Sequence, residues 1–417
     1  MEIKRDIYLN QLINARQNGF IKVVTGPRRC GKSFLLTTLF HNHLLSEGIA
    51  EDHIIEVALE DRMNQKLRDP DAMLEYVRSR IIDEKLYFII LDEVQKMGDF
   101  VDVLNSLLHI KNADVYVTGS NSHFLSTDIA TEFRGRDHQI RMYPLCFSEF
   151  FSAVGGEKNS AWKDYYTFGG LPLILSFKTD HEKAEYLQRL FQTVYMADIL
   201  ERYKIKNNKE LRELVNILAS SIGSPNNPTK ISNTFRTVEK SNITSQTIDN
   251  YLTYLQEAFV VNRAERYDVK GRKYIGTLSK YYFEDTGIRN ALINFRQQEE
   301  NHIMENIIYN ELRIRGYQVD VGQVEIRKRT PDGKQQIIHL EIDFVVNQAS
   351  QRYYIQSAFQ MPDKEKEHQE SQSLVNVNDS FKKIIIVRDD IKPWRNEKGI
   401  LIMGLMDFLL DKSSLEL

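Results

Sequence analysis

The sequence predicts an α/β fold that begins with a parallel sheet covered by helices on both faces. Three observations predict it: strand-like apolar segments recur in the first part of the chain, a glycine-containing octet joins the first of them to a helix, and a later one ends in two acids. Unbroken apolar runs are typical of strands buried on both faces, as in parallel sheets. The chain has 417 residues, 42% of them hydrophobic, which suffices for two or three domains with sizeable cores.

The octet from Gly26 to Ser33, GPRRCGKS, fits the pattern GxxxxGK[ST] and lies between an apolar strand at 20–24 and a helix at 34–40. Its two glycines let the backbone wrap around phosphates with N–H groups pointing inward. We expect Lys32 to reach the phosphate oxygens and Ser33 to bind Mg²⁺, while the helix start attracts the anion. The alternative is a chance match in a turn. The predicted cofactors are ATP and Mg²⁺, and the predicted nucleotide-binding residues are Gly26, Pro27, Arg28, Arg29, Cys30, Gly31, Lys32, Ser33 and Phe34.

A second apolar strand, 87–91, ends in the carboxylates of Asp92 and Glu93, sixty residues after Lys32. Open α/β sheets bind ligands at the carboxyl ends of their strands. We therefore expect Asp92 to hold Mg²⁺ and Glu93 to polarise the attacking water. An ordinary strand-to-loop transition is the alternative for such a pair taken alone. A further strand at 54–58 lies between the two motifs in sequence, which favours the additional-strand P-loop ATPases over kinases and small GTPases.

Polar and basic residues follow a third predicted strand at 113–118. If this strand lies beside 87–91 in a parallel sheet, Ser120 or Asn121 can contact the γ-phosphate or the water, and a polar turn is the alternative. Arg134 or Arg136 can sense or stabilise phosphate, within one chain or across a subunit boundary. The spacing does not separate these two arginines, and both can also be solvated. We take Lys32, Glu93, Asn121 and Arg136 as the candidate catalytic residues, and Ser33 and Asp92 as the candidate metal ligands.

Together these motifs resemble the AAA-type ATPases of bacteria and archaea that carry a C-terminal domain of uncharacterised function. The residues that carry the resemblance are GPRRCGKS at 26–33, LDE at 91–93, VTGSNS at 117–122, FRGR at 133–136 and FGGLP at 168–172. The resemblance implies an AAA+ type ATPase core at 1–150, a helical segment with the GGLP turn at 151–205, a winged-helix-like domain at 206–285 and an α/β domain similar to PD-(D/E)xK nucleases at 286–417. It also assigns sensing to the Ser120–Asn121 pair.

The middle region favours contact with DNA. A helical pattern at 209–222 is followed by a polar segment, 241–255, whose Thr and Ser cap and polar first turn resemble a recognition helix. Residues 227–280 hold nine Lys or Arg against five Asp or Glu, inside a chain of net charge −3. Such a domain can also serve as a lid or as a dock for a protein partner. The candidate phosphate contacts of its wing are Arg263, Arg266, Lys270, Arg272 and Lys273.

The C-terminal region departs from the nuclease layout that it resembles. In that layout an Asp and a Glu or Gln hold Mg²⁺, and a lysine two residues further on handles the water. Asp343 and Gln356 match, with Glu305 on a preceding helix, but Ala358 stands in the lysine position. Lys364 and Lys366 lie beyond the strand. We therefore expect no nuclease cleavage and a domain kept for packing, DNA holding or partner recognition.

Composition and the charged N-terminal residues predict a cytoplasmic protein. Two cysteines, Cys30 and Cys146, provide no disulfide framework, and no apolar run reaches the length of a signal sequence or a membrane span. Two functions remain. The first is an ATP-hydrolysing machine that acts on or is recruited to DNA. The second is a nucleotide-dependent switch or scaffold whose later domains hold a protein partner.

Overall fold

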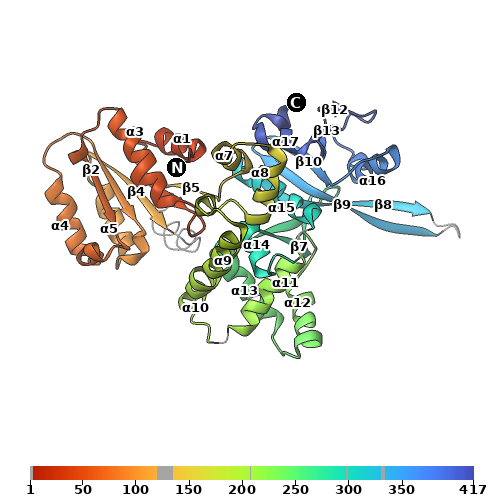
Figure 1. Cartoon of the computed structure of the whole chain (residues 1–417), viewed down its shortest axis with the longest axis horizontal. Helices are drawn as coiled ribbons and strands as arrows, with labels where there is room; N and C mark the ends of the chain where they lie inside the picture. Colours follow the sequence, from red (N-terminus) through yellow and green to blue (C-terminus); the bar gives the residue numbers. More distant parts are fainter. Residues whose placement is uncertain (1–2, 120–134, 207, 297–298, 330–333) are drawn as a thin grey trace. The chain divides into compact units, whose positions relative to one another are not determined.

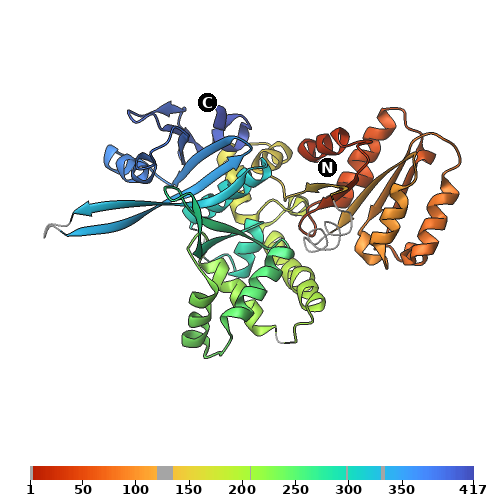
Figure 2. The same cartoon turned by 180° about the vertical axis from the view of Figure 1, so that it is seen from behind.

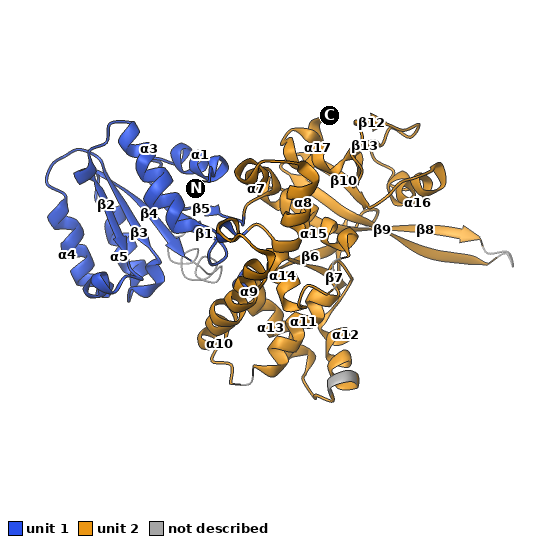
Figure 3. Cartoon of the chain, in the orientation of Figure 1, with its two compact units in different colours: residues 1–144, 171–173, 257–259 blue, residues 145–170, 174–256, 260–417 orange. Residues whose placement is uncertain are grey.

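The computed structural model of the chain describes residues 3–119, 135–206, 208–296, 299–329 and 334–417 (Figure 1). The chain divides into two compact units (Figure 3). Unit 1 contains residues 1–144, 171–173 and 257–259, and unit 2 contains residues 145–170, 174–256 and 260–417. Each unit has a sheet of its own, so each is described by itself.

Unit 1 alternates strands and helices over most of its length. Its elements are α1 (Asp6–Asn14), β1 (Ile21–Thr25), α2 (Lys32–Phe34), the π-helical turn η1 (Leu35–Phe40), α3 (His41–Ser46), η2 (Glu51–His53), β2 (Ile54–Ala58), η3 (Arg62–Arg68), α4 (Pro70–Arg80), β3 (Tyr87–Asp92), η4 (Val94–Lys96), α5 (Phe100–Leu108), β4 (Ala113–Gly119) and β5 (Asp137–Arg141).

The five strands of unit 1 form a wholly parallel sheet in the order β2-β3-β4-β1-β5. This confirms the predicted parallel sheet and the pairing of the third predicted strand with 87–91. The strand that separates β1 from β3 in space is β4, whereas β2, which lies between them in sequence, is at the edge. The order brings the carboxyl ends of β1, β3 and β4 together, at the edge where ligands bind in such sheets.

Side chains of β3 and β4 are buried on both faces of this sheet, as their unbroken apolar runs predict. On one face the rings of Phe88 and Tyr116 pack against Phe40 of η1, with centroids 6.2 and 4.6 Å from it. On the other face Leu91 and its neighbours join one apolar cluster with residues of α4 and α5. Helices therefore pack against both faces of the sheet and bury its central strands.

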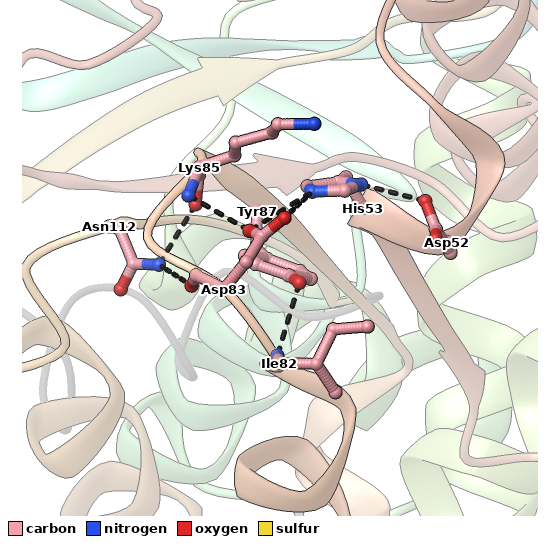
Figure 4. A network of polar contacts seen from close by, with 7 residues as sticks. All are labelled: Asp52, His53, Ile82, Asp83, Lys85, Tyr87 and Asn112. Atoms are coloured by element: carbon pink, nitrogen blue, oxygen red, sulfur yellow. Dashed lines mark hydrogen bonds and ion pairs between the residues drawn. The ribbon is translucent and has the colours of Figure 1, made fainter.

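A polar network closes the amino end of β2 and β3 (Figure 4). His53 is buried, stacks on the ring of Tyr87 at 4.5 Å, and lies between Asp52 (2.7 Å) and Asp83 (3.2 Å). Asn112 Nδ2 donates to the backbone oxygens of Asp83 (3.0 Å) and Lys85 (2.8 Å). These contacts tie the loop before β3 to the loop before β4, at the end of the sheet opposite to the octet.

Unit 2 begins with helices and continues into a mixed structure. Its elements, with η6 beginning in residues assigned to unit 1, are α7 (Phe147–Val154), α8 (Lys158–Phe168), η6 (Pro172–Ser176), α9 (Asp180–Leu190), η7 (Phe191–Met196), α10 (Ala197–Arg202), α11 (Lys209–Ser220), α12 (Pro228–Thr234), η8 (Phe235–Glu239), α13 (Ser245–Glu257), β6 (Val261–Asp268), β7 (Lys273–Phe283), α14 (Thr286–Leu292), α15 (Glu300–Ile314), β8 (Gln318–Arg329), β9 (Gln335–Gln348), β10 (Gln351–Ala358), α16 (Lys364–Val375), β11 (Lys382–Val387), β12 (Trp394–Arg395), β13 (Leu401–Gly404), α17 (Leu405–Leu410) and η9 (Ser414–Glu416).

The eight strands of unit 2 form one sheet in the order β12-β13-β11-β10-β9-β8-β6-β7. The β6–β7 hairpin therefore continues the sheet of the C-terminal region. Three helices, α11 to α13, precede this hairpin, and an isolated antiparallel bridge joins Asn226, before α12, to Ser279 in β7. Thr244 caps α13, since its hydroxyl accepts from the backbone N–H of Thr247 at 3.1 Å.

Gly169 and Gly170, the two glycines of the GGLP turn, pack closely against the segment before α14 within unit 2. The Asp285 carboxylate accepts from the backbone N–H of Gly170 (2.8 Å) and of Ile288 (2.9 Å), so that it caps α14 and fixes the turn. Burial raises the pKa of Asp285 to about 6, and the backbone hydrogen bonds oppose this rise. A Cβ at Gly287 would lie 2.0 Å from the carbonyl oxygen of Phe168. The close backbone approach explains why glycine occupies position 287.

Candidate nucleotide-binding site

The octet forms the turn from β1 into α2, at the carboxyl end of the parallel sheet. Gly26 has φ +146°, and a Cβ there would lie 2.0 Å from the carbonyl oxygen of Met142. Gly31, also with positive φ, directly precedes α2. Backbone conformation and the close approach of Met142 thus require glycine at position 26.

Lys32 lies at the centre of this loop. Its side chain is buried, and its Nζ donates to the backbone oxygens of Gly26 (3.0 Å) and Pro27 (2.9 Å). Both acceptors are neutral carbonyl oxygens, so neither of these hydrogen bonds neutralises the positive charge of Lys32. A phosphate anion is a stronger partner for such an ammonium than a carbonyl is.

Asp92, the last residue of β3, is the acid that contacts α2, the helix that begins within the octet and is called the loop helix below. Its Oδ1 accepts from the hydroxyl of Ser33 (3.0 Å) and from the hydroxyl of Thr118 (2.5 Å). Burial raises the pKa of Asp92 above its usual value, while the hydrogen bonds from Thr118 and Ser33 and the charge of Lys32 act against this rise. The two residues predicted to bind Mg²⁺ are therefore in direct contact, and their oxygen atoms are the ligand type that Mg²⁺ prefers.

Glu93 follows at the turn out of β3, in a left-handed backbone conformation with φ +54°. Its backbone N–H donates to the Thr118 hydroxyl at 2.8 Å, and its carboxylate accepts from the side-chain amide of Gln95. Only 8% of Glu93 is exposed. A non-glycine residue held at positive φ is costly, and such positions cluster at functional sites.

Two residues of the site escaped the sequence analysis. Thr118 of β4 bridges Asp92 and the Glu93 backbone, whereas the sequence pointed to the polar pair that follows it. Arg5 is buried, and its guanidinium donates to the backbone oxygens of Cys30 (3.3 Å) and Tyr143 (2.6 Å). Arg5, although distant in sequence, thus stabilises the octet loop through these two hydrogen bonds. A charged residue before α1 carries no local signal of that role.

The remaining predicted residues differ in where they lie. Ser120, Asn121 and Arg134 fall outside the described residues. Arg136 directly precedes β5, and its backbone oxygen accepts from the N–H of Ile21 at the start of β1. It is therefore at the amino edge of the sheet, and the structure does not bring it together with Lys32. Phe34 is 38% exposed on the first turn of the loop helix.

We expect the variant Thr118→Val to lower ATP turnover roughly 10-fold or more, because hydrogen bonds to charged groups contribute about 1.5–3 kcal/mol each. Valine keeps the shape of threonine but removes the donor to Asp92 and the acceptor for the Glu93 N–H. Steady-state phosphate release at saturating ATP and Mg²⁺ measures the effect. Thr118→Ser, which keeps the hydroxyl, is the matched control, and equal turnover of the Val and Ser variants would contradict the bridging role.

The acids predicted in the C-terminal region meet in a buried cluster within unit 2, around a lysine from another strand. Lys280 of β7 places its Nζ 2.9 Å from Glu305, 2.8 Å from Glu341 and 3.6 Å from Asp343. The hydroxyl of Tyr282 also donates to Glu305, at 2.7 Å. Burial opposes the charge of Lys280, but the three carboxylates outweigh it and raise the pKa of Lys280, while burial and Glu305 raise the pKa of Asp343 to about 7.

Position 358 holds an alanine, and Lys280 of β7 supplies the positive charge beside the acids. Ala358 lies in an apolar cluster with Tyr354 and Val387, while Gln356 accepts from the Ser373 hydroxyl at 3.5 Å. The aromatic residues after Lys280 are buried, as expected for core residues. The sequence gives no sign that Lys280 points toward acids 25 to 63 residues later in the chain.

Replacing Lys280 by methionine should destabilise unit 2 by about 3–5 kcal/mol, because the buried Asp343 and the half-buried Glu305 and Glu341 lose their counter-ion. The loss should be larger at about pH 8 than at about pH 5, since burial raises the pKa of Asp343 to about 7 in the folded protein and the unpaired carboxyl is penalised only where it ionises. Both tryptophans, Trp162 and Trp394, belong to unit 2, so urea unfolding followed by their fluorescence reports on it. The exposed Lys398→Met is the control, and similar stability of both variants would contradict the counter-ion role.

Comparison with known proteins follows the division seen in the structure. The family model of an AAA domain matches residues 18–151, and that of a domain of unknown function matches residues 159–299. An uncharacterised protein of Haemophilus influenzae is 33% identical over 415 residues, covering 98% of both chains. An uncharacterised protein of Methanocaldococcus jannaschii is 28% identical over 82% of this chain and 75% of its own. A Walker-type ATPase of Pyrococcus abyssi has a TM-score of 0.49 at 14% identity, over 70% of this chain and 96% of its own.

Proposed function

Because the chain belongs to the prokaryotic AAA-type P-loop ATPases, we propose that it binds ATP with Mg²⁺ at Gly26–Ser33 and hydrolyses ATP to ADP and phosphate. One observation carries the proposal. The Ser33 hydroxyl, the Asp92 carboxylate and the Thr118 hydroxyl form a continuous chain of hydrogen bonds from the loop helix to the ends of β3 and β4. An acid pair, a phosphate loop and a polar strand end are thereby joined at one edge of the sheet.

The side chains at this edge fit a Mg²⁺–nucleotide complex. The Ser33 hydroxyl and the Asp92 carboxylate are hard oxygen donors, and they would hold the ion. Mg²⁺, when bound, neutralises negative charge on the phosphate oxygens. Lys32 exchanges its two carbonyl partners for phosphate oxygens, and the loop N–H groups add further donors.

Glu93 is the residue proposed to act on the water. The hydrogen bond from its backbone N–H to the Thr118 hydroxyl fixes the backbone of Glu93. This contact orients the Glu93 side chain, which follows Asp92 at the end of β3. A carboxylate held in this way can orient a water molecule and accept its proton as the oxygen attacks phosphorus. Asn121 as a sensor remains part of the proposal. Arg136, at the opposite edge of the sheet, can take part only if a second copy of the chain supplies it.

We also propose that the protein is recruited to DNA through residues 206–285, read as a winged-helix-like domain. The order of α11, α12, α13 and the β6–β7 hairpin supports this reading, as does the bridge between Asn226 and Ser279. Among the predicted wing residues, Arg263, Lys270, Arg272 and Lys273 are exposed, and Arg266 is half-buried. Arg266 lies 4.0 Å from Glu341, and the guanidinium of Arg263 donates to Ser279, so these two arginines stabilise the protein itself.

The accompanying domain division and location are likewise proposed. We keep the working bounds 1–150, 151–205, 206–285 and 286–417, and a C-terminal domain similar to nucleases but without cleavage activity. No helix in the described part of the chain is long and apolar enough to span a membrane. Cys30 and Cys146 are both buried free thiols, which suits the reducing cytoplasm that we propose for the protein.

Phosphate release from ATP, measured with and without duplex DNA, tests the proposal. Turnover that depends on Mg²⁺ supports hydrolysis, and faster turnover with DNA supports an ATP-driven machine. Binding of ATP with slow turnover that DNA leaves unchanged, together with a protein partner captured only in the ATP state, would instead support a nucleotide-dependent switch or scaffold. Absence of ATP binding under all conditions would overturn both.

A further inference from the structure

The outer parts of β8 and β9 form a two-stranded ribbon that leaves the sheet of unit 2. β8 pairs with β6 only over Val321–Gln323, and β9 pairs with β10 only over Phe344–Gln348. Over Val324–Arg329 and Gln335–Leu340 the two strands pair, within the described residues, with each other alone. We call these two segments the β8–β9 ribbon. Its six residue pairs span about 20 Å, and it projects from the rest of unit 2 in both views (Figures 1 and 2).

The ribbon carries positive charge on both of its faces. Arg327, Lys328 and Arg329 are consecutive and exposed on β8, and Lys334 directly precedes β9. Because successive side chains of a strand alternate between faces, Arg327 and Arg329 share one face and Lys328 lies on the other. Glu325, near the base of the ribbon, lies 3.6 Å from Arg327, and past it the described residues of the ribbon include no carboxylate. This concentration of cations stands out in a chain whose net charge is −3.

The turn of the β6–β7 hairpin lies against the base of the ribbon and adds to this charge. Lys270 Nζ donates to the backbone oxygen of Glu325 at 2.7 Å, and the backbone N–H of Val269 donates to the oxygen of Gln323 at 3.0 Å. Val269 also joins the apolar cluster that contains Val324 and Ile326, which anchors the ribbon base. Arg272 and Lys273 are exposed in the same hairpin.

The exposed cations of the ribbon suit a partner that carries negative charge. A two-stranded ribbon is at best marginally stable in water on its own, and its outer residues contribute exposed cations rather than a core. Cations that face in both directions suit a ligand that surrounds the ribbon with negative charge on two sides. The major groove of duplex DNA, about 12 Å wide and flanked by two phosphate backbones, admits a two-stranded ribbon.

We propose that the β8–β9 ribbon enters a groove of duplex DNA, with Arg327, Lys328 and Arg329 contacting phosphates on its two walls. The β6–β7 turn then contacts the adjoining backbone through Arg272 and Lys273. This inference rests on the proposed recruitment to DNA and names a second surface for it, whose main part, the β8–β9 ribbon, lies outside residues 206–285. It predicts that most of the salt-dependent affinity comes from the ribbon rather than from α13.

The test compares DNA binding of two triple variants of the full chain. In the ribbon variant Arg327, Lys328 and Arg329 are each replaced by Gln; in the control variant the exposed lysines Lys158, Lys163 and Lys364 are each replaced by Gln, so that the charge change is the same. We expect the ribbon variant to bind a duplex at least about 10-fold more weakly. The slope of log Kd against log salt should fall by about 3, since each phosphate contact contributes about 0.9.

Four outcomes would overturn the ribbon proposal. Wild-type affinity in the ribbon variant, or an equal loss in the control variant, removes the assigned surface while leaving recruitment through residues 206–285 intact. Equal or tighter binding of single strands or of duplex RNA excludes insertion into a DNA groove, because A-form RNA has a narrow major groove. No wild-type binding at low salt overturns both DNA proposals, while ATP hydrolysis, measured in the same preparation, stands or falls separately. Wild-type fluorescence of Trp162 and Trp394 in the ribbon variant shows that unit 2 is folded, and unchanged basal ATP turnover shows the same for unit 1.

Discussion

Replacing Lys32 by alanine should weaken ATP binding by about 100-fold or more, because a charge-assisted contact to each of two phosphate groups is lost. The Lys32 ammonium is buried in the loop and held by the oxygens of Gly26 and Pro27. Alanine leaves the backbone in place, since the loop is fixed by the close approach of Gly26 to Met142 and by Arg5. Calorimetric titration with ATP and Mg²⁺ measures the change directly.

Lys111→Ala serves as the control for the Lys32 variant. Lys111 is exposed in the turn before β4, at the amino end of the sheet, so it belongs to the same unit but not to the loop. We expect the control to bind ATP as the wild type does, and thermal unfolding followed by circular dichroism should show that both variants are folded. If Lys32→Ala bound ATP with wild-type affinity, the octet would not be the nucleotide site.

Replacing Glu93 by glutamine should lower ATP turnover by about 10²–10⁴-fold and leave ATP binding intact, because a positioned general base contributes about that factor. Glutamine has the size of glutamate, so the buried site and the backbone bond from Glu93 to Thr118 are kept. The variant loses only the negative charge that orients the water and accepts its proton. Phosphate release under saturating ATP, together with ATP affinity, separates the two effects.

Glu75→Gln on the exposed face of α4 is the matched control for the Glu93 variant. It makes the same chemical change in the same unit, away from the carboxyl ends of the strands, and we expect unchanged turnover. A Glu93→Gln variant that hydrolyses ATP at the wild-type rate would remove Glu93 from the proposed mechanism. Loss of ATP binding in that variant would show that the carboxylate supports the loop rather than the chemistry.

The sequence predicted the parallel sheet and the meeting of the octet with Asp92, because both signals are local. An octet with fixed spacing and an apolar strand ending in acids each report on a few neighbouring residues. The role of Thr118 was missed because it depends on strand order: β4 lies between β1 and β3, which places the last side chains of β4 beside Asp92. From sequence alone, Thr118 and the polar residues after it are equivalent.

Arg5 and Lys280 escaped prediction because their partners are distant in sequence. Arg5 contacts residues 25 and 138 positions further on, and no local pattern marks a charged residue that will be buried. Lys280 neutralises acids of α15 and β9 because β7 joins the same sheet as β9. The local sequence around position 358 of β10 carries no information about a lysine that another strand, β7, brings to these acids.

A single-turnover experiment tests most directly whether the chain hydrolyses ATP at the octet with the help of Glu93. An excess of the protein is mixed with a trace of ATP labelled on the γ-phosphate and with Mg²⁺, and bound ATP and free phosphate are separated over time. We expect the wild type to bind the labelled ATP and release labelled phosphate. The Glu93→Gln variant should retain the label as bound ATP, and the Lys32→Ala variant should bind almost none. Bound ATP that the wild type never cleaves, or cleavage by the Glu93→Gln variant at the wild-type rate, would contradict this expectation.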